Sequence, residues 1–137
     1  MEQYFGKKYK LKTSENFDEF MKALGIGFIS RKTAASLSPV CELTKNDDGT
    51  YIYSFSTPIR TLKYVFKLGE EVITERADGA KMKSTFTIEG NSVIHIEVDD
   101  NGKASKHVRT FSDDKLVVIS TLQGWDGECT RIYELVN

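Results

Sequence analysis

The chain has 137 residues, the size of one domain, of which 39% are hydrophobic and 28% are charged. Its net charge of -1 excludes the overall basic excess that is typical of nucleic-acid-binding domains. Residues 1–10 lack the apolar run of a secretory signal, and Cys41 and Cys129 are too few for a disulfide framework. These features predict one cytoplasmic domain over residues 1–137.

The first predicted element is a strand near the N-terminus. Lysines at positions 8, 10 and 12 alternate with Tyr9 and Leu11. Because successive side chains of a strand point to opposite faces, this pattern predicts one solvated and one buried face.

Two short helices are predicted next. The first contains an apolar stripe at helical spacing, made of Phe17, Phe20, Met21 and Leu24. Thr13 or Ser14 is suited to cap its start, and Gly25 is suited to end it. A second helix is predicted over about residues 28–37 and is closed off by Pro39. A DNA-reading helix pair is one alternative, but the remaining hundred residues have a β pattern.

Short strands separated by turn signals fill the rest of the chain. The turn signals recur about every ten residues, at positions 46–49, 57–58, 69–70, 78–79, 90–91, 100–102, 113–114 and 123–127. With the N-terminal strand this gives about ten antiparallel strands, and closure into a barrel would protect their edges. Ten strands enclose more space than side chains readily fill, so the barrel is expected to be hollow.

A candidate binding group lies on the last predicted strand, residues 129–133. Arg131 and Tyr133 share one face of it, about 7 Å apart along the strand. If that face points inward, an anionic partner such as a ligand carboxylate would balance the buried guanidinium. If it points outward, Arg131 is an ordinary solvated arginine, and Arg109, two residues before Phe111, presents the same choice.

Enzyme and metal chemistry find little support. His95 lies between Ile94 and Ile96 and is predicted to face outward, while His107 is predicted to be structural. The two histidines are not at metal-ligand spacing, and no nucleophile or phosphate-loop motif occurs. We therefore predict no catalytic residue, no metal and no cofactor. Trp125 lies in a predicted loop, where exposure or packing on the closed end of the barrel is expected.

The sequence resembles the intracellular lipid-binding proteins, the family of the fatty-acid-binding and cellular retinoic-acid-binding proteins. The matching segments are ordered along nearly the whole chain, at residues 5–6, 9, 14–19, 21–25, 31–32, 66–71, 78–79 and 129–133. The resemblance implies a mainly β fold, a ten-stranded antiparallel up-and-down β-barrel with a two-helix lid between strands 1 and 2.

The resemblance also implies roles for particular residues. In this family two arginines and a tyrosine hold the ligand carboxylate, and they match Arg109, Arg131 and Tyr133. Positions that match the tail contacts and the portal are Phe17, Met21, Ala34, Pro39, Ile59, Arg60 and Ala77. Residues 56–60 are about one residue longer than in typical fatty-acid binders and resemble the retinoic-acid binders, which carry an arginine where Arg60 lies.

The predicted function is therefore that of a non-catalytic carrier of one long-chain fatty acid, with a retinoic-acid carrier as the alternative. An enzyme acting on an acyl chain would depend on His107 with Cys41 or Cys129. An interaction module with a filled barrel is a further alternative. The family implies a monomer in the cytoplasm, and in some relatives the nucleus, without nucleic acid as a partner. It also implies transient contact with anionic membranes through the lid cations Lys22, Arg31 and Lys32.

Overall fold

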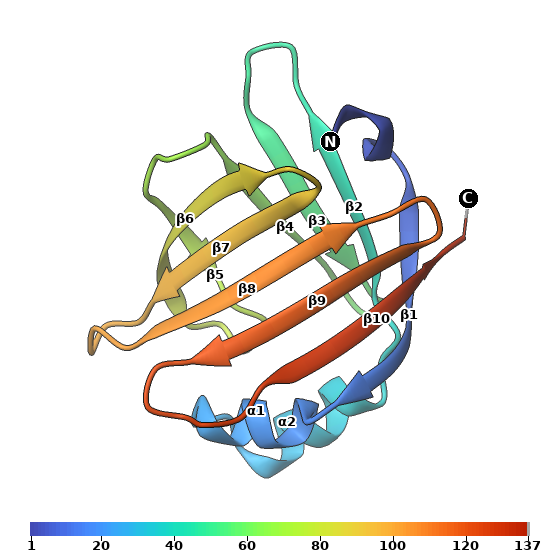
Figure 1. Ribbon diagram of the computed structural model, residues 1–137. Helices are drawn as coiled ribbons and strands as arrows, with labels where there is room; N and C mark the ends of the chain where they lie inside the picture. The colour runs from blue at the N-terminus through green and yellow to red at the C-terminus, as the bar shows by residue number, and fades with distance from the viewer. Residues whose placement is uncertain (137) are drawn as a thin grey trace.

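The computed structural model describes residues 1–136. Within this part of the chain, ten antiparallel strands form one sheet that curves into a nearly closed barrel (Figure 1). The strands are β1 (Lys8–Glu15), β2 (Val40–Lys45), β3 (Tyr51–Ser56), β4 (Thr61–Phe66), β5 (Val72–Glu75), β6 (Lys81–Glu89), β7 (Ser92–Val98), β8 (Ala104–Phe111), β9 (Lys115–Leu122) and β10 (Cys129–Leu135). The predicted fold class is confirmed.

The strand order explains both the closure and its one interruption. Neighbours in sequence pair with each other except β4 and β5, while β1 pairs with β10 and so joins the two ends of the chain. The sheet edges at β4 and β5 are bridged by aromatic side chains. Phe66 of β4 stacks on Phe86 of β6 with 3.9 Å between ring centroids. This stacking connects β4 to the other side of the gap, where β4 and β5 are not paired.

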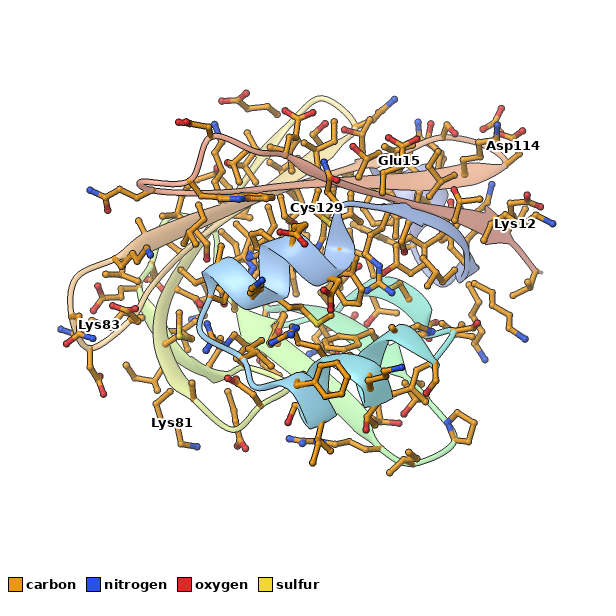
Figure 2. The ribbon with its side chains drawn as sticks, turned by 90° about the horizontal axis from the view of Figure 1, so that it is seen from below. Lys12, Glu15, Lys81, Lys83, Asp114 and Cys129 are labelled. Carbon is orange, nitrogen blue, oxygen red and sulfur yellow. The ribbon has the colours of Figure 1, made fainter. Side chains whose placement is uncertain are left out.

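A two-helix lid covers one end of the barrel. Helices α1 (Phe17–Ala23) and α2 (Phe28–Ala35) follow β1 and lie across the opening, as the view from below shows (Figures 1 and 2). The second helix ends before residue 37. The predicted capping residues are wrong, because β1 continues through them and pairs Ser14 with Arg131. The N-cap is Asn16, in the left-handed conformation with φ 60°.

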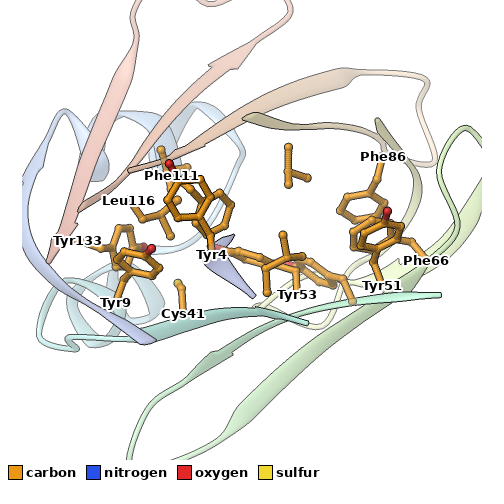
Figure 3. Packing of buried hydrophobic residues seen from close by; sticks show 14 residues of the cluster. Tyr4, Tyr9, Cys41, Tyr51, Tyr53, Phe66, Phe86, Phe111, Leu116 and Tyr133 are labelled. Carbon is orange, nitrogen blue, oxygen red and sulfur yellow. The ribbon is translucent and has the colours of Figure 1, made fainter. Parts of the chain in front are cut away.

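Aromatic packing closes the opposite end. A short 3-10 helix, η1 (Glu2–Tyr4), places Tyr4 on Phe111, with ring centroids 6.1 Å apart. Tyr9 packs edge-on against Phe111 and donates a hydrogen bond to the Ser112 carbonyl at 3.1 Å. Figure 3 shows Tyr9 beside Tyr133 on one side of this cluster. The filled core therefore lies away from the lid, which leaves space under the helices.

The β9–β10 loop joins the lid instead of the closed end. The Trp125 ring lies 5.6 Å from the Phe20 ring and packs with Leu122 and Cys129. The expected packing of Trp125 on the closed end is wrong, because β9 runs toward the lid and its hairpin turns there (Figure 1). Trp125 is half-buried and packs between α1 and the barrel wall.

Replacing Gly127 with alanine is expected to open this contact. A Cβ at Gly127 would overlap the Trp125 ring, so the indole must move from Phe20. Overpacking of this kind lowers stability by about 1–3 kcal/mol. Trp125 is the only tryptophan, so its emission should shift to the red in the folded variant, while urea unfolding gives the stability loss. Unchanged emission together with unchanged stability would contradict the expected displacement. Gly27→Ala, at a position without a positive φ where the added carbon meets no atom within 4 Å, is the control for the added methyl group.

Candidate ligand-binding cavity

A cavity of about 450 Å³ lies between the lid and the aromatic core. Its volume is in the range of cavities that hold one small ligand. Apolar side chains from both helices form its roof, namely Phe17, Phe20, Met21, Leu24, Ile29 and Ala34. Charged and polar groups from β7, β8, β9 and β10 contribute to its wall. The cavity is therefore apolar on the lid side and polar on part of the barrel side.

All seven residues predicted to contact a ligand tail or to form the portal line this cavity: Phe17, Met21, Ala34, Pro39, Ile59, Arg60 and Ala77. Their contact with a ligand remains a prediction. The Ile59 side chain is 72% exposed at the mouth. Arg60 links the two portal turns, since its guanidinium donates a hydrogen bond to the Ala77 carbonyl at 3.2 Å and lies 3.5 Å from Glu75.

The pairing of β8, β9 and β10 places the two predicted anchor arginines in one row. Arg109 pairs with Val118, and Val118 pairs with Arg131. Tyr133 lies one row nearer the closed end, paired with Leu116. Arg109, Arg131 and Tyr133 all line the cavity, so the structure selects the inward orientation that spacing alone left open.

The two arginines occupy different surroundings. Arg109 is 7% exposed, and its Nη1 donates a hydrogen bond to Nδ1 of His95 at 3.0 Å. The Arg109 guanidinium carbon also lies 4.4 Å from the centre of the Tyr53 ring, a cation–π contact. Arg109 is therefore held rigidly by the barrel wall itself.

Arg131 connects the barrel to the lid. Its Nε donates a hydrogen bond to Ser14 Oγ at 3.0 Å, and its guanidinium carbon lies 3.7 Å from the Phe17 ring centre. The side chain is only half-buried. A group that binds Arg131 would therefore also contact the region where α1 begins.

One phenol and two thiols adjoin the arginines. Burial raises the pKa of Tyr133 well above its usual value, although nearby Arg131 acts in the opposite direction. Burial likewise raises the pKa of the Cys41 thiol, and raises that of Cys129 to about 11. Tyr133 therefore stays a neutral hydrogen-bond donor, and both thiols stay protonated, which makes them poor nucleophiles.

A buried polar cluster that the sequence analysis missed lies on β7 and β8. Glu97 accepts a hydrogen bond from His107 Nε2 at 2.7 Å, and its Oε2 lies 3.8 Å from His95 Nε2. The prediction that His95 faces outward is wrong, since its side chain is fully buried. The flanking isoleucines are the half-exposed residues, because in a hollow barrel the inner face does not have to be the more apolar one.

A signal for this cluster was present in the sequence. The turn near residue 101 makes a hairpin, and counting outward from it pairs residue 98 with 104, hence His95 with His107. Glu97 is two residues from His95 and therefore faces the same way. The sequence therefore places the three titratable groups on one face of the sheet, but it does not indicate that this face is the inner one.

The hydrogen bonds assign the proton positions in the cluster. An arginine can only donate, so Nδ1 of His95 must accept from Arg109, and the proton of His95 lies on Nε2. That proton is donated to Ser84 Oγ at 2.9 Å. The candidate metal-ligand atoms of His95, Glu97 and His107 lie within 4.8 Å of one another, but both ring nitrogens of each histidine already have hydrogen-bond partners. The arrangement fits a hydrogen-bond network and not a metal centre.

Burial and charge set the protonation states of the cluster. Burial lowers the pKa of His95 well below its usual value, and nearby Arg109 lowers it further. Burial also lowers the pKa of His107, although the hydrogen bond to Glu97 opposes this. Burial alone would raise the pKa of Glu97, but the hydrogen bond from His107 and the charge of Arg109 outweigh burial and lower it. The ionised Glu97 balances one of Arg109 and Arg131, so their part of the wall keeps one excess positive charge. At the mouth, Arg60 and Arg76 are paired with Glu75 and Asp78.

An enclosed apolar space with an excess positive charge, under a helical lid, defines a carrier for an amphipathic molecule. Comparison with known proteins agrees with this class. The model of the lipocalin / cytosolic fatty-acid binding protein family matches residues 3–133, and the chain belongs to this family. Its members are lipid carriers, so the protein is a non-enzymatic lipid-binding carrier.

The similarity to individual fatty acid-binding proteins extends over nearly the whole chain. A muscle fatty acid-binding protein of Schistocerca gregaria is 39% identical over 135 residues, which cover 98% of each chain. The crystal structure of a brain-tissue fatty acid-binding protein of Drosophila melanogaster is 40% identical, with a TM-score of 0.87 over 96% of this chain and 98% of the other. A Schistosoma mansoni fatty acid binding protein in complex with arachidonic acid is 25% identical, with a TM-score of 0.91 over 100% and 98% of the two chains.

Neither helix of the described residues, 1–136, has the length and hydropathy that a membrane-spanning helix needs.

Proposed function

We propose that the protein binds one long-chain fatty acid in its cavity and carries it through the cytoplasm. The observation that carries this proposal is the row formed by Arg109 and Arg131, with Tyr133 beside it, in the wall of a largely apolar cavity. A carboxylate there gains charge-assisted hydrogen bonds and removes the excess positive charge. The names of the relatives point to the same ligand class.

The apolar tail supplies most of the gross binding free energy. Each buried methylene contributes about 0.8 kcal/mol, and ordering and desolvation costs offset much of the sum. With its carboxylate at Arg109, the tail extends toward Phe17 and Met21 under the lid. The anchor then determines orientation and acid selectivity, whereas the tail determines affinity.

Identification of the bound lipid tests this proposal. The purified protein is extracted with organic solvent, and delipidated protein is titrated with oleate in a calorimeter. We expect free fatty acids in the extract and one binding site per chain. A neutral lipid in the extract, or no heat of binding with any fatty acid, would exclude the proposed function. Gel filtration and cell fractionation test the monomeric state and the expected cytoplasmic and nuclear locations.

A retinoic-acid carrier is the second candidate, because Arg60 lies at the cavity mouth and ties together the two portal turns. The retinoic-acid carboxylate would use the same anchor, Arg109, Arg131 and Tyr133, and Arg60 would lie near the other end of the ligand at the mouth. A competition titration separates the two candidates. Tighter binding of retinoic acid than of oleate would favour this alternative.

The lid also carries exposed apolar and basic side chains. Phe28 and Ile29 are exposed on α2 beside Lys32, and Lys22 is exposed on α1. Arg31 differs from these lysines, because it forms a salt bridge with Asp18 at 3.0 Å. We propose that Lys22 and Lys32, with the two exposed apolar side chains, contact anionic membranes during transfer.

Lys32→Glu is expected to slow fatty-acid transfer to anionic vesicles. One basic residue near such a surface contributes about 1 kcal/mol, or roughly a fivefold change, and replacement by a negative charge exceeds this. Transfer of a fluorescent fatty acid is followed at low and high salt. Lys83→Glu, on the barrel wall away from the lid (Figure 2), is the matched control. Equal rates for both variants, or no salt dependence, would exclude contact through the lid.

A further inference from the structure

Glu97 has a hydrogen-bonding capacity that the proposed carboxylate anchor does not use. The residue is only 4% exposed, yet it lines the cavity. Its Oε1 accepts from His107 Nε2 at 2.7 Å and from Ser105 Oγ at 3.3 Å. Its Oε2 has only His95 Nε2 nearby, at 3.8 Å, which is too far for a hydrogen bond. Among residues 1–136, no buried side-chain polar atom shielded from solvent lacks a partner, so Oε2 opens onto the cavity.

The position of this acceptor follows from strand register. His107 is two residues from Arg109 on β8, and Ser105, which pairs with Glu97, is two residues further. Each two-residue step is about 7 Å along a strand. The steps lead toward the lid, because His107 lies 6.0 Å from the Phe20 ring of α1. A chain anchored at Arg109 and extending to the lid passes the His107–Glu97 pair part of the way along its length.

The charge of the cluster indicates which group fits there. Glu97 is ionised and its charge is balanced by Arg109, while His107 already donates its Nε2 proton to the carboxylate. A neutral donor can bind Oε2 without burying another charge, whereas an ammonium group would meet the nearby arginine. A carbonyl or ether oxygen brings no proton and would face a carboxylate. A neutral O–H or N–H donor fits there, and the simplest such donor on an acyl chain is a hydroxyl.

We propose that the cavity selects fatty acids that carry a hydroxyl group on the internal part of the chain, with Glu97 Oε2 as the acceptor. This inference rests on the proposed fatty-acid function and deepens it. It gives the polar wall a role in ligand selection, because a plain acyl chain would leave Oε2 facing methylenes. Burying a carboxylate oxygen against methylenes costs free energy, which a hydroxyl donor recovers.

Calorimetry with stearic acid and its hydroxylated isomers tests the proposal. The isomers carry the hydroxyl at successive positions from near the carboxylate to the chain end. We expect at least one internal isomer to bind about tenfold more tightly than stearic acid, and the terminal isomer to bind more weakly. If every isomer binds more weakly than stearic acid, the inference is wrong. If stearic acid itself does not bind, the fatty-acid function fails, which is a different result.

A matched pair of variants assigns the effect to one carboxylate. Glu97→Gln removes the charge and is expected to reduce the preference for the best internal isomer at least fivefold, measured as the ratio of its affinity to that of stearic acid. Glu89→Gln makes the same change on an exposed side chain of β6 and is expected to leave the ratio unchanged. An unaltered ratio in Glu97→Gln would overturn the assignment. Should that variant fail to fold, the isomer series with the native protein still decides the proposal.

Discussion

Replacing Arg109 with glutamine is expected to weaken oleate binding by about 1.5–3 kcal/mol, or roughly 10- to 150-fold. Arg109 is the more buried of the two predicted anchor arginines, so its attraction for a carboxylate is little screened by solvent. Its geometry is already fixed by His95 and Tyr53, so little ordering cost is incurred on binding. Calorimetric titration of the delipidated variant gives the change directly.

The matching alcohol separates anchoring from stability. Oleyl alcohol lacks the carboxylate and should bind native protein and Arg109→Gln with similar affinity. Arg131→Gln is the comparison variant, and its effect should lie at the lower end of the same range, because Arg131 is half-buried and bonded to Ser14. Equal losses for the acid and the alcohol would mean that Arg109 maintains the cavity and does not hold a head group.

The barrel and its lid were predictable because their patterns are redundant. The alternation around Tyr9, one helical stripe and regularly spaced turns each indicate the same architecture. The inward orientation of Arg131 was not predictable from spacing, because the two faces of β10 are nearly equally polar. Cys129 and Tyr133 accompany Arg131 on one face, and Thr130 and Ile132 occupy the other. Only strand pairing around the closed sheet distinguishes these faces.

His95 shows why polarity misleads in a hollow barrel. A filled core requires apolar side chains, so a histidine between two isoleucines is expected to point outward. Here the inner face of β7 borders a cavity and a polar network, and Ser84, Glu97 and Arg109 supply partners for His95. The isoleucines instead cover the outer surface, where β-branched residues favour the strand conformation. Long-range partners decided the orientation, and they cannot be read from a single strand.

The protein is expected to lose stability steeply as the pH falls below 6.5. His95 and His107 have pKa values lowered by burial, so in mild acid the unfolded chain binds protons that the folded chain does not. Stability must then rise with pH, and each histidine that stays neutral in the fold contributes a slope of about 1.4 kcal/mol per pH unit. These are the only two histidines of the chain. When urea unfolding is measured between pH 7.5 and 5, the slope of the free energy of unfolding against pH should therefore correspond to the uptake of one to two protons on unfolding.

Single substitutions measure how much each histidine contributes to this slope. His95→Gln removes the histidine with the stronger shift and should lower the slope by about one proton, whereas His107→Gln should lower it by less, because the Glu97 hydrogen bond opposes the effect of burial there. Glu97 does not account for the slope in this range, since its pKa lies below the usual carboxyl value and it stays ionised above pH 5. A pH-independent free energy of unfolding, or a slope that survives both substitutions, would mean that the histidines are not held neutral. A slope that disappears with them would show that the polar wall of the cavity is maintained at the expense of stability in acid.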